Sequence, residues 1–427
     1  MILQVNPSSV KGAITVPGSK SHTIRAITAA LLAEGVSIVR DPLLSDDTAS
    51  TLAAAEKLGA QVEKSSGIWK ITGTGGNLQQ PDRPLDMGNS GTGLRMLTAA
   101  AALTCGKVDF TGDESLCNRN MLPLLNSLAE LGAVITAAPG GKAPLSVQGP
   151  IHGGRTGVEA LCSQFLSALL FAAPCINDKE LNIDVTALSE EPYVKITLNW
   201  LKRLQAEFTY SEDLMHYTIP GNQKLQAFDC VIPADFSTAA FPLGAGIVAG
   251  CDDGVTIKNL DFSDAQGDKA VFAMLESLGA GLQYNRDSSV TILPGIRLHS
   301  GELDLGQTPD ALPLLAAVAA VQAPGCVITL SNAAQARNKE TDRIACMTRE
   351  LRKMGADIEE YHDRMVIHGS QLHGAVVDSC KDHRLAMALA VAALAADSPT
   401  QIIDAESCAV TYPDFIKDFK ALGADFS

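Results

Sequence analysis

The stretch LGAQVEKSSGIWKITG, at residues 58–73, contains the pattern from which the fold can be predicted. A helical segment ends at Leu58-Gly59-Ala60, an alternating segment follows, and that segment closes at Ile71-Thr72-Gly73. A glycine just past a helix end adopts the left-handed conformation that stops the helix. The stretch therefore predicts one structural unit, in which a helix, a glycine stop and a strand follow in order.

The helix-ending triplet recurs along the whole chain. The central residues of successive copies are 73, 73, 74, 76 and 68 positions apart, which indicates six tandem units. In the third copy Gln205 replaces the glycine, so we expect that helix to be stopped differently. The copies are Leu58-Gly59-Ala60, Leu131-Gly132-Ala133, Leu204-Gln205-Ala206, Leu278-Gly279-Ala280, Met354-Gly355-Ala356 and Leu422-Gly423-Ala424.

A second signal, a short strand that closes on glycine, follows five of the copies. After the sixth copy the sequence ends at Ser427, but the segment Ile14–Gly18 has the same form. We therefore expect the N-terminal strand to complete the sixth unit. The five strands close at Gly73, Gly149, Gly221, Gly295 and Gly369.

This arrangement predicts two domains. Residues 19–230 form the first, with three contiguous repeats, and residues 1–18 plus 231–427 form the second, which is discontinuous. The chain crosses between them near Gly18 and near 227–233, so we expect a hinge and a cleft that can close.

Composition narrows the class of protein. The chain is 46% hydrophobic and 5% aromatic, which is typical of an α/β protein. Its net charge of −15 argues against nucleic acid or an anionic membrane as a partner, and an anionic substrate would need a local cluster of Arg and Lys.

Ten cysteines without a C-x-x-C pair indicate reduced thiols in the cytoplasm. We find no signal peptide, and the apolar runs 311–321 and 385–396 are shorter than the ~20 residues of a membrane span, so we expect buried helices there.

Polar segments that open predicted helices are the candidate binding elements. Lys20, Ser21 and Arg25 lie at one helix start, where backbone N–H groups and cations favour an anion; a capped helix with exposed basic residues is the alternative. The glycine-rich segment 88–95 opens another helix and lets a ligand approach its amides, although a plain turn fits equally. Asn118-Arg119-Asn120 and Ser163-Gln164 each fit either a ligand site or a simple turn or cap.

The second half of the chain carries the charged candidates. In residues 338–343, Arg343 follows Glu340 by three positions and Lys339 by four, so the three side chains can share one helix face. This spacing brings an acid and two cations within reach of one ligand. An exposed ion-paired turn is the alternative. His383 beside Arg384 suits a proton donor next to an anion clamp, although a solvated charged turn fits at least as well. Asp310 precedes an apolar helix, where it could be only a cap. No metal-ligand spacing stands out, so side chains and helix ends must supply the electrostatics.

Taken together, six segments resemble the 5-enolpyruvylshikimate-3-phosphate synthase family over nearly the whole chain. They are PGSKSHTIR at 17–25, SDD at 45–47, GNSGT at 88–92, SQFL at 163–166, KETDR at 339–343 and DHR at 382–384. The resemblance implies a two-domain inside-out α/β barrel of six βαβαββ repeats, three per domain, with a pseudo-threefold axis in each domain. It also implies transfer of the enolpyruvyl group of phosphoenolpyruvate to the 5-hydroxyl of shikimate 3-phosphate, with release of phosphate, through a tetrahedral adduct and with no metal or organic cofactor.

The resemblance also implies roles for single residues. Asp310 and Glu340 would be the proton-transfer carboxylates, assisted by Lys20 and His383. The small-molecule substrates are the only partners we expect, for a monomer in the cytoplasm with no nucleic acid and no membrane. Phosphoenolpyruvate would be held by Lys20, Gly91, Arg119, Gln164, Arg343 and Arg384. Shikimate 3-phosphate would be held by Lys20, Ser21, Arg25, Ser163, Gln164, Asp310 and Lys339.

Four positions depart from the family pattern. Glu190 stands where members with an S-K-P-Y segment place a phosphate-binding serine, and Cys162 and Gln335 replace a common Ser and Asn. Val410 replaces a lysine that some branches lack. Two alternatives therefore stay open: a paralogue with another hydroxyl acceptor, or a weakly catalytic binding module. The related UDP-N-acetylglucosamine enolpyruvyl transferase fits less well, because it typically has S-K-N where this chain has Ser19-Lys20-Ser21.

Overall fold

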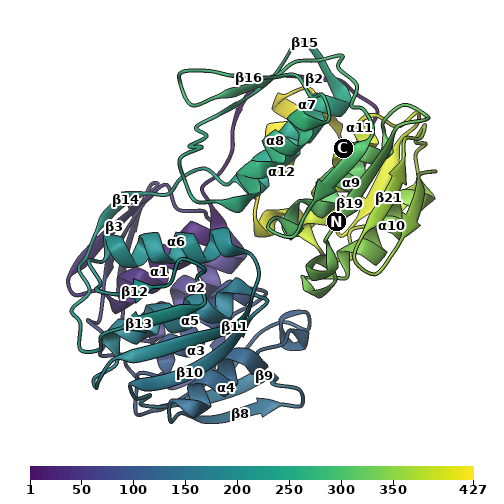
Figure 1. Cartoon of the computed structure of the whole chain (residues 1–427). Helices are drawn as coiled ribbons and strands as arrows, with labels where there is room; N and C mark the ends of the chain where they lie inside the picture. The colour runs from purple at the N-terminus through teal and green to yellow at the C-terminus, as the bar shows by residue number, and fades with distance from the viewer. The chain divides into compact units, whose positions relative to one another are not determined.

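The computed structural model describes all 427 residues, which divide into two compact units. Gly18–Ile232 form the contiguous unit, and Met1–Pro17 with Pro233–Ser427 form the discontinuous unit (Figure 1). No helix in the structure has both the length and the apolar character needed to cross a bilayer.

The contiguous unit contains six α-helices and twelve strands. Its helices are α1 (Lys20–Leu32), α2 (Asp46–Lys57), α3 (Gly91–Ala101), α4 (Leu122–Glu130), α5 (Ser163–Ala172) and α6 (Glu191–Arg203). Its strands are β3 (Val36–Arg40), β4 (Gln61–Ser65), β5 (Ile68–Thr72), β6 (Leu85–Asp86), β7 (Lys107–Thr111), β8 (Val134–Ala138), β9 (Lys142–Gln148), β10 (Gly154–Ala160), β11 (Leu181–Leu188), β12 (Thr209–Tyr210), β13 (His216–Ile219) and β14 (Asp229–Val231).

The discontinuous unit has the same number of each. Its helices are α7 (Phe236–Ala249), α8 (Ala270–Ser277), α9 (Leu312–Ala320), α10 (Arg343–Lys353), α11 (His383–Leu394) and α12 (Phe415–Ala421). Its strands are β1 (Ile2–Asn6), β2 (Val10–Thr15), β15 (Gly250–Lys258), β16 (Leu282–Tyr284), β17 (Val290–Ile292), β18 (Gly301–Asp304), β19 (Val327–Ser331), β20 (Asp357–Glu360), β21 (Met365–His368), β22 (Val376–Asp378), β23 (Thr400–Ile403) and β24 (Asp425–Phe426).

The strands form six four-stranded sheets that share one pairing pattern. In each sheet two strands pair in parallel, and a third and a fourth strand follow in antiparallel pairing. The α/β class expected from the composition is therefore confirmed. The strand orders are β14-β3-β5-β4, β6-β7-β9-β8, β10-β11-β13-β12, β2-β15-β17-β16, β18-β19-β21-β20 and β22-β23-β1-β24.

In each unit every second helix is almost completely buried. The expected buried helices are confirmed as α9 and α11, in which every residue is buried. A helix that is apolar all round packs on all its sides, so such helices form the centre of a unit, and their side chains are the core. The contiguous unit has three such helices, namely α1, α3 and α5.

In the contiguous unit the exceptions to this burial lie at the N-terminal tips of α1, α3 and α5. In α1 only Lys20 and Ser21 escape burial, in α3 only Thr92, and in α5 only Gln164. Three of these four residues are among the predicted ligands. The fold therefore presents these polar side chains at the ends of helices whose remaining residues are core.

The glycine stops predicted from the triplets are confirmed. Gly59, Gly132 and Gly279 follow helix ends with φ values of 112°, 100° and 100°. The expectation for Gln205 is wrong, because it takes the same left-handed turn, with φ of 57°. Its backbone N–H donates to Lys202, and that of Ala206 donates to Leu201, so the turn is closed by the hydrogen bonds that a glycine would make.

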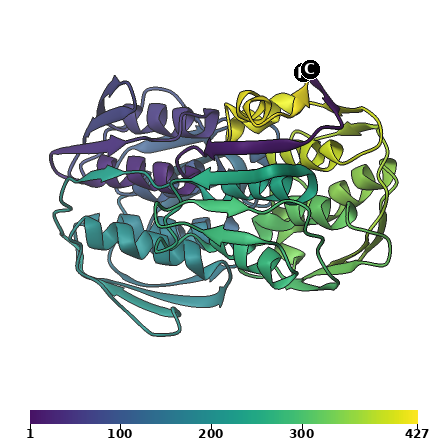
Figure 2. The same ribbon diagram turned by 90° about the horizontal axis from the view of Figure 1, so that it is seen from above.

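The expected position of the N-terminal strand also needs correction. The segment Ile14–Gly18 does not complete the sixth unit, because β2 pairs in parallel with β15 and starts the fourth sheet. The sixth sheet is instead completed by β1, which lies between β23 and β24. In Figure 2 the N and C labels fall together, and Gln4 and Ser427 exchange two backbone hydrogen bonds of 2.8 Å. Alternation and a closing glycine mark a strand but do not specify its partner.

Candidate functional site

In the contiguous unit two arginines converge on the N-terminus of α3. A Cβ added to Gly91 would lie 2.7 Å from Nη1 of Arg119 and 2.9 Å from Nη1 of Arg95, so only glycine leaves room between the guanidinium groups. Arg119 also donates to Oδ1 of Asn89 at 2.6 Å. Ser90 caps the helix by accepting from the N–H of Gly93. Two cations and a helix N-terminus therefore meet at one small residue, as an anion site requires.

The N-terminus of α5 carries the next pair of predicted ligands. Oε1 of Gln164 accepts from Nη1 of Arg95 at 2.7 Å, which links this helix to the arginines around Gly91. The hydroxyl of Ser163 donates to Oε2 of Glu190 at 3.0 Å, and its backbone N–H donates to the same oxygen at 3.4 Å. Glu190 is buried and has φ of 56°. The Glu190 carboxylate thus accepts from the Ser163 donors that the family resemblance assigns to shikimate 3-phosphate.

At α1 the predicted cations are held by protein groups. Nζ of Lys20 lies 3.1 Å from Oδ2 of Asp47, and both side chains are largely buried. Arg25 lies deep in the unit and donates to the hydroxyl of Thr197 at 2.9 Å and to the carbonyls of Ser21 and Tyr193. Burial lowers the pKa of Arg25 to about 10, against the charge of nearby anionic groups. Ser21 therefore orients Arg25 through its carbonyl, besides offering its hydroxyl.

In the discontinuous unit Arg343 is the centre of a charged cluster. Its fully buried guanidinium donates to Oδ1 of Asp310 at 2.7 Å, to Oε2 of Glu340 at 2.6 Å and to both oxygens of Asp382 at 2.8 and 3.3 Å. These contacts use four of its five N–H groups. The predicted contact between Glu340 and Arg343 is confirmed, whereas Arg343 offers a ligand only its one remaining N–H.

Asp310 lies among three cations. Besides Arg343, Nη2 of Arg384 lies 3.1 Å from its Oδ2, and Nζ of Lys339 lies 3.5 Å from its Oδ1. Burial alone would raise the pKa of the Asp310 carboxyl, but Arg384, Lys339 and Arg343 outweigh it and hold that pKa well below its usual range. Asp310 is therefore ionised at neutral pH, and it does more than cap a helix, because it contacts three cations.

His383 and Asp382 complete this cluster at the start of α11. Asp382 caps the helix by accepting from the N–H of Arg384, and Nδ1 of buried His383 lies 3.8 Å from its Oδ1. Asp268 is also buried, and burial together with the charge of Asp310 raises its pKa to about 6. Four carboxylates and three cations, all predicted from the sequence except Asp382 and Asp268, therefore share one end of this unit.

Four contributors were missed from the sequence. Arg95 follows Gly91 by one helical turn, and that spacing would have placed it on the same face of α3. Asp47 and Asp382 lie in the quoted SDD and DHR segments, where their partners Lys20 and Arg343 could not be identified. Asp268 lies in the short 3-10 helix Gly267–Lys269, and no sequence pattern marks it.

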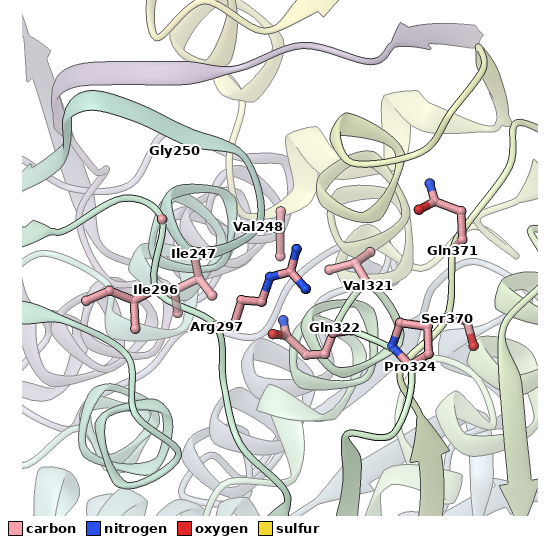
Figure 3. Close-up of a pocket in the computed structure, with 12 residues that line it drawn as sticks. Ile247, Val248, Gly250, Ile296, Arg297, Val321, Gln322, Pro324, Ser370 and Gln371 are labelled. Carbon is pink, nitrogen blue, oxygen red and sulfur yellow. The ribbon is translucent and has the colours of Figure 1, made fainter.

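A separate cavity of about 460 Å³ lies at the other ends of two core helices (Figure 3). Ile247, Val248 and Val321 line it at the C-terminal ends of α7 and α9, together with Arg297 and Gln322. Helix C-termini carry partial negative charge and do not favour anions. None of the predicted site residues lines this cavity.

Residues 5–419 match the family described as EPSP synthase (3-phosphoshikimate 1-carboxyvinyltransferase). The chain belongs to this family. The resemblance seen in the motifs is thereby confirmed, and 3-phosphoshikimate 1-carboxyvinyl transfer in the shikimate pathway is the activity of the chain.

Individual relatives agree with this membership. Curated 3-phosphoshikimate 1-carboxyvinyltransferases of Ruminiclostridium cellulolyticum and Acetivibrio thermocellus are 40% and 41% identical to the chain, over 99% and 100% of it and 99% of each relative. The EPSP synthase structure from Acinetobacter baumannii has a TM-score of 0.83 at 26% identity and covers 100% of this chain and 99% of its own. The enolpyruvyl transferase NikO from Streptomyces tendae has a TM-score of 0.81, covers 100% and 98% of the two chains, and at 17% identity shows the fold alone.

The departures from the EPSP synthase pattern have clear positions. Cys162 is the N-cap residue of α5 and makes no side-chain capping bond. Gln335 lies in the 3-10 turn Ala334–Asn338 that leads to Lys339, and Val410 ends the 3-10 helix Ala405–Val410. Glu190, described above, is the departure that contacts a predicted ligand residue, Ser163.

Proposed function

We propose that each unit supplies a defined part of the enolpyruvyl transfer site. Lys20, Gly91, Arg119 and Gln164 of the contiguous unit, with Arg343 and Arg384 of the discontinuous unit, bind phosphoenolpyruvate. The convergence of Arg119 and Arg95 on Gly91 supports this assignment most directly. Both substrates are polyanions, and several cations are needed to offset their desolvation and mutual repulsion.

The proposed acceptor site uses the tips of α1 and α5 together with Asp310 and Lys339. Lys20, Ser21, Arg25, Ser163 and Gln164 bind shikimate 3-phosphate. Lys20 and Gln164 are only partly buried, at the tips of helices whose other residues are nearly all core, which supports a role in binding rather than folding. Backbone N–H groups at these helix starts add favourable dipoles for a phosphate.

Asp310 and Glu340 are the proposed proton-transfer groups, with Lys20 and His383 assisting. In the transfer the 5-hydroxyl oxygen bonds to C2 of phosphoenolpyruvate, the hydroxyl proton leaves to a base, and the methylene carbon receives a proton from an acid. Loss of a methyl proton and of phosphate then restores the vinyl group. Arg384 and Lys339 hold the pKa of Asp310 low. When a bound anion draws these cations away, the pKa rises, and Asp310 becomes a better proton acceptor.

The contact between Glu190 and Ser163 bears on the choice of acceptor. A phosphate that binds Ser163 must displace a buried carboxylate from the same donors, or share them with it at an electrostatic cost. This contact is the one observation that favours a paralogue with an uncharged acceptor. Replacing Glu190 by Ser should lower the KM for shikimate 3-phosphate if phosphate is the natural ligand there, whereas an unchanged or higher KM would favour the paralogue.

We also propose the finer architecture of an inside-out α/β barrel, six βαβαββ repeats in two pseudo-threefold domains, for a cytoplasmic monomer. Six four-stranded sheets with one pairing pattern, three to a unit, support the repeats. Ten free cysteines support a reducing compartment.

The deciding experiment is a phosphate-release assay with phosphoenolpyruvate and shikimate 3-phosphate. Steady release that depends on both substrates is expected. Release only with other hydroxyl acceptors would identify the paralogue, and binding of both substrates without any release would identify a binding module.

A variant tests the catalytic assignment. Asp310→Asn should lose turnover at least ~100-fold while still binding both substrates, because it keeps its shape and loses its basicity. Asp357→Asn, at the exposed start of β20, is the matched control and should behave as wild type. Near-normal turnover of the Asp310 variant would exclude that residue as an essential base.

A further inference from the structure

Two cysteines lie near the Arg343 cluster, one on each of the elements that hold it. Cys346, in the first turn of α10, precedes Arg349 by three residues on the same helix face, and Cys380 lies in the turn between β22 and α11. Nη2 of Arg349 donates to Sγ of Cys380 at 2.9 Å. Both cysteines are half-buried and free. The sequence contained no C-x-x-C pair, so the fold alone brings these thiols together.

The turn that carries Cys380 is fixed against α10. The N–H of Asp378 donates to Oε2 of Glu350 at 2.8 Å, and the N–H of Cys380 donates to Oδ1 of Asp378 at 2.7 Å. Cys380 and Lys381 have positive φ values of 54° and 59°, a conformation that disfavours side chains other than glycine. Asp382, two residues further on, holds Arg343. The thiol pair and the charged cluster therefore connect the same two elements.

The chemistry of the pair favours exchange with a disulfide. A hydrogen bond from Cys380 lowers the pKa of Cys346 to about 7, against burial and with help from Arg349. A thiol with a pKa close to the ambient pH is the most effective attacking group. By contrast, burial raises the pKa of Cys175 to about 12 and that of Cys408 to about 11, so these thiols are unreactive at neutral pH.

We propose that Cys346 and Cys380 form a reversible disulfide by exchange with a low-molecular-weight disulfide, and that this bond slows enolpyruvyl transfer. The Cys346 thiolate attacks one sulfur of the small disulfide, forming a mixed disulfide and releasing one small thiolate. Cys380 then loses its proton to solvent, with Arg349 stabilising its thiolate, attacks the Cys346 sulfur and releases the second small thiolate. The protein loses two electrons and two protons, and the small disulfide is reduced to two thiols.

The bond must disturb the neighbouring cluster. A disulfide holds its sulfurs about 2.05 Å apart, closer than any hydrogen bond between thiols. Closing it therefore draws the Cys380 turn toward α10 and removes the acceptor of Arg349. Asp382 and Arg343 lie on these elements, and misplacement by about 1 Å at a catalytic centre can cost up to ~100-fold in rate. The effect on turnover rests on the proposed function, whereas the disulfide does not.

The test treats the purified full-length chain with oxidised glutathione at neutral pH, blocks the remaining thiols and digests with trypsin. Cleavage places each cysteine alone in one peptide, residues 344–349 and 365–381, so the cross-link has a unique mass. We expect this linked peptide, a fall of roughly tenfold or more in kcat/KM, and recovery of both with dithiothreitol. Cys346→Ser and Cys380→Ser should keep their activity under oxidation, and Cys326→Ser, a half-buried thiol of the same unit, should respond like wild type.

Each outcome decides one part of the proposal. Absence of the linked peptide, or pairing of either cysteine with another, would overturn it. A formed disulfide with unchanged turnover would overturn its effect on the cluster. If the reduced protein releases no phosphate from the two substrates, the proposed function fails. The peptide map still tests whether Cys346 and Cys380 form a disulfide.

Discussion

Replacing Gly91 by Ala should weaken phosphoenolpyruvate binding without weakening the fold. The new Cβ would lie 2.7 Å from Nη1 of Arg119 and 2.9 Å from Nη1 of Arg95. Ordinary contact begins near 3.4 Å, so the two guanidinium groups must retreat by about 0.7 Å (3.4 less 2.7) and about 0.5 Å (3.4 less 2.9). Both are far ends of flexible side chains, and they move at little cost to the protein.

The magnitudes separate binding from stability. Ala in a helix is better than Gly by up to ~1 kcal/mol, so the free energy of unfolding should stay level or rise slightly. A displaced pair of charge-assisted hydrogen bonds should cost about 1.4 kcal/mol of ligand affinity, or roughly tenfold in the KM for phosphoenolpyruvate. Titration of phosphoenolpyruvate in the phosphate-release assay, combined with thermal unfolding, measures both quantities.

Gly93→Ala, one helical position beyond Thr92, is the matched control. Its Cβ would lie 2.2 Å from Oγ1 of Thr51 and 2.7 Å from Oγ of Ser90, both buried, so this variant should lose ~2 kcal/mol of stability by overpacking. A Gly91 variant that melts earlier than wild type and keeps its KM would refute the assignment of Gly91 to the anion site.

Three other changes test the fold and its charges. Gln205→Gly should stabilise the protein by up to ~1 kcal/mol, since glycine carries no steric penalty at its φ of 57°; urea unfolding measures this, and a loss would contradict the strain argument. Asp382→Asn should cost ~3 kcal/mol, because fully buried Arg343 loses a paired carboxylate; a loss under about 1 kcal/mol in the same assay would show that the pair matters little. Asp268, with its pKa raised to about 6, binds its proton more tightly in the folded state, so its contribution to stability is present below about pH 4 and is lost as the pH rises through 6. Asp268→Asn should therefore exceed wild type in unfolding free energy at pH 7 and match it at pH 4, whereas an equal difference at both values would exclude this titration.

The helix ends and the positions of the binding segments could be predicted from the sequence because they depend on local chemistry. Glycine stops such as Gly59 and the start of α1 at Lys20 need only neighbouring residues. The partner of the N-terminal strand could not be predicted, since β1 and β2 both alternate and only tertiary pairing distinguishes their sheets. The same limit applies to the ion pairs. The sequence placed Glu340 beside Arg343, but the contacts of Asp310 and Asp382 with that arginine join residues tens of positions apart.

The position of β1 in the last sheet sets the order in which the nascent chain can assemble. Residues 18–232 are continuous, so the ribosome delivers everything this unit needs before the rest is made. Strand β1 leaves the ribosome before the other strands of the structure, yet its neighbours β23 and β24 are synthesised after all of them. Residues 2–6 must therefore wait, unpaired, through the synthesis of the intervening strands before their own sheet can close.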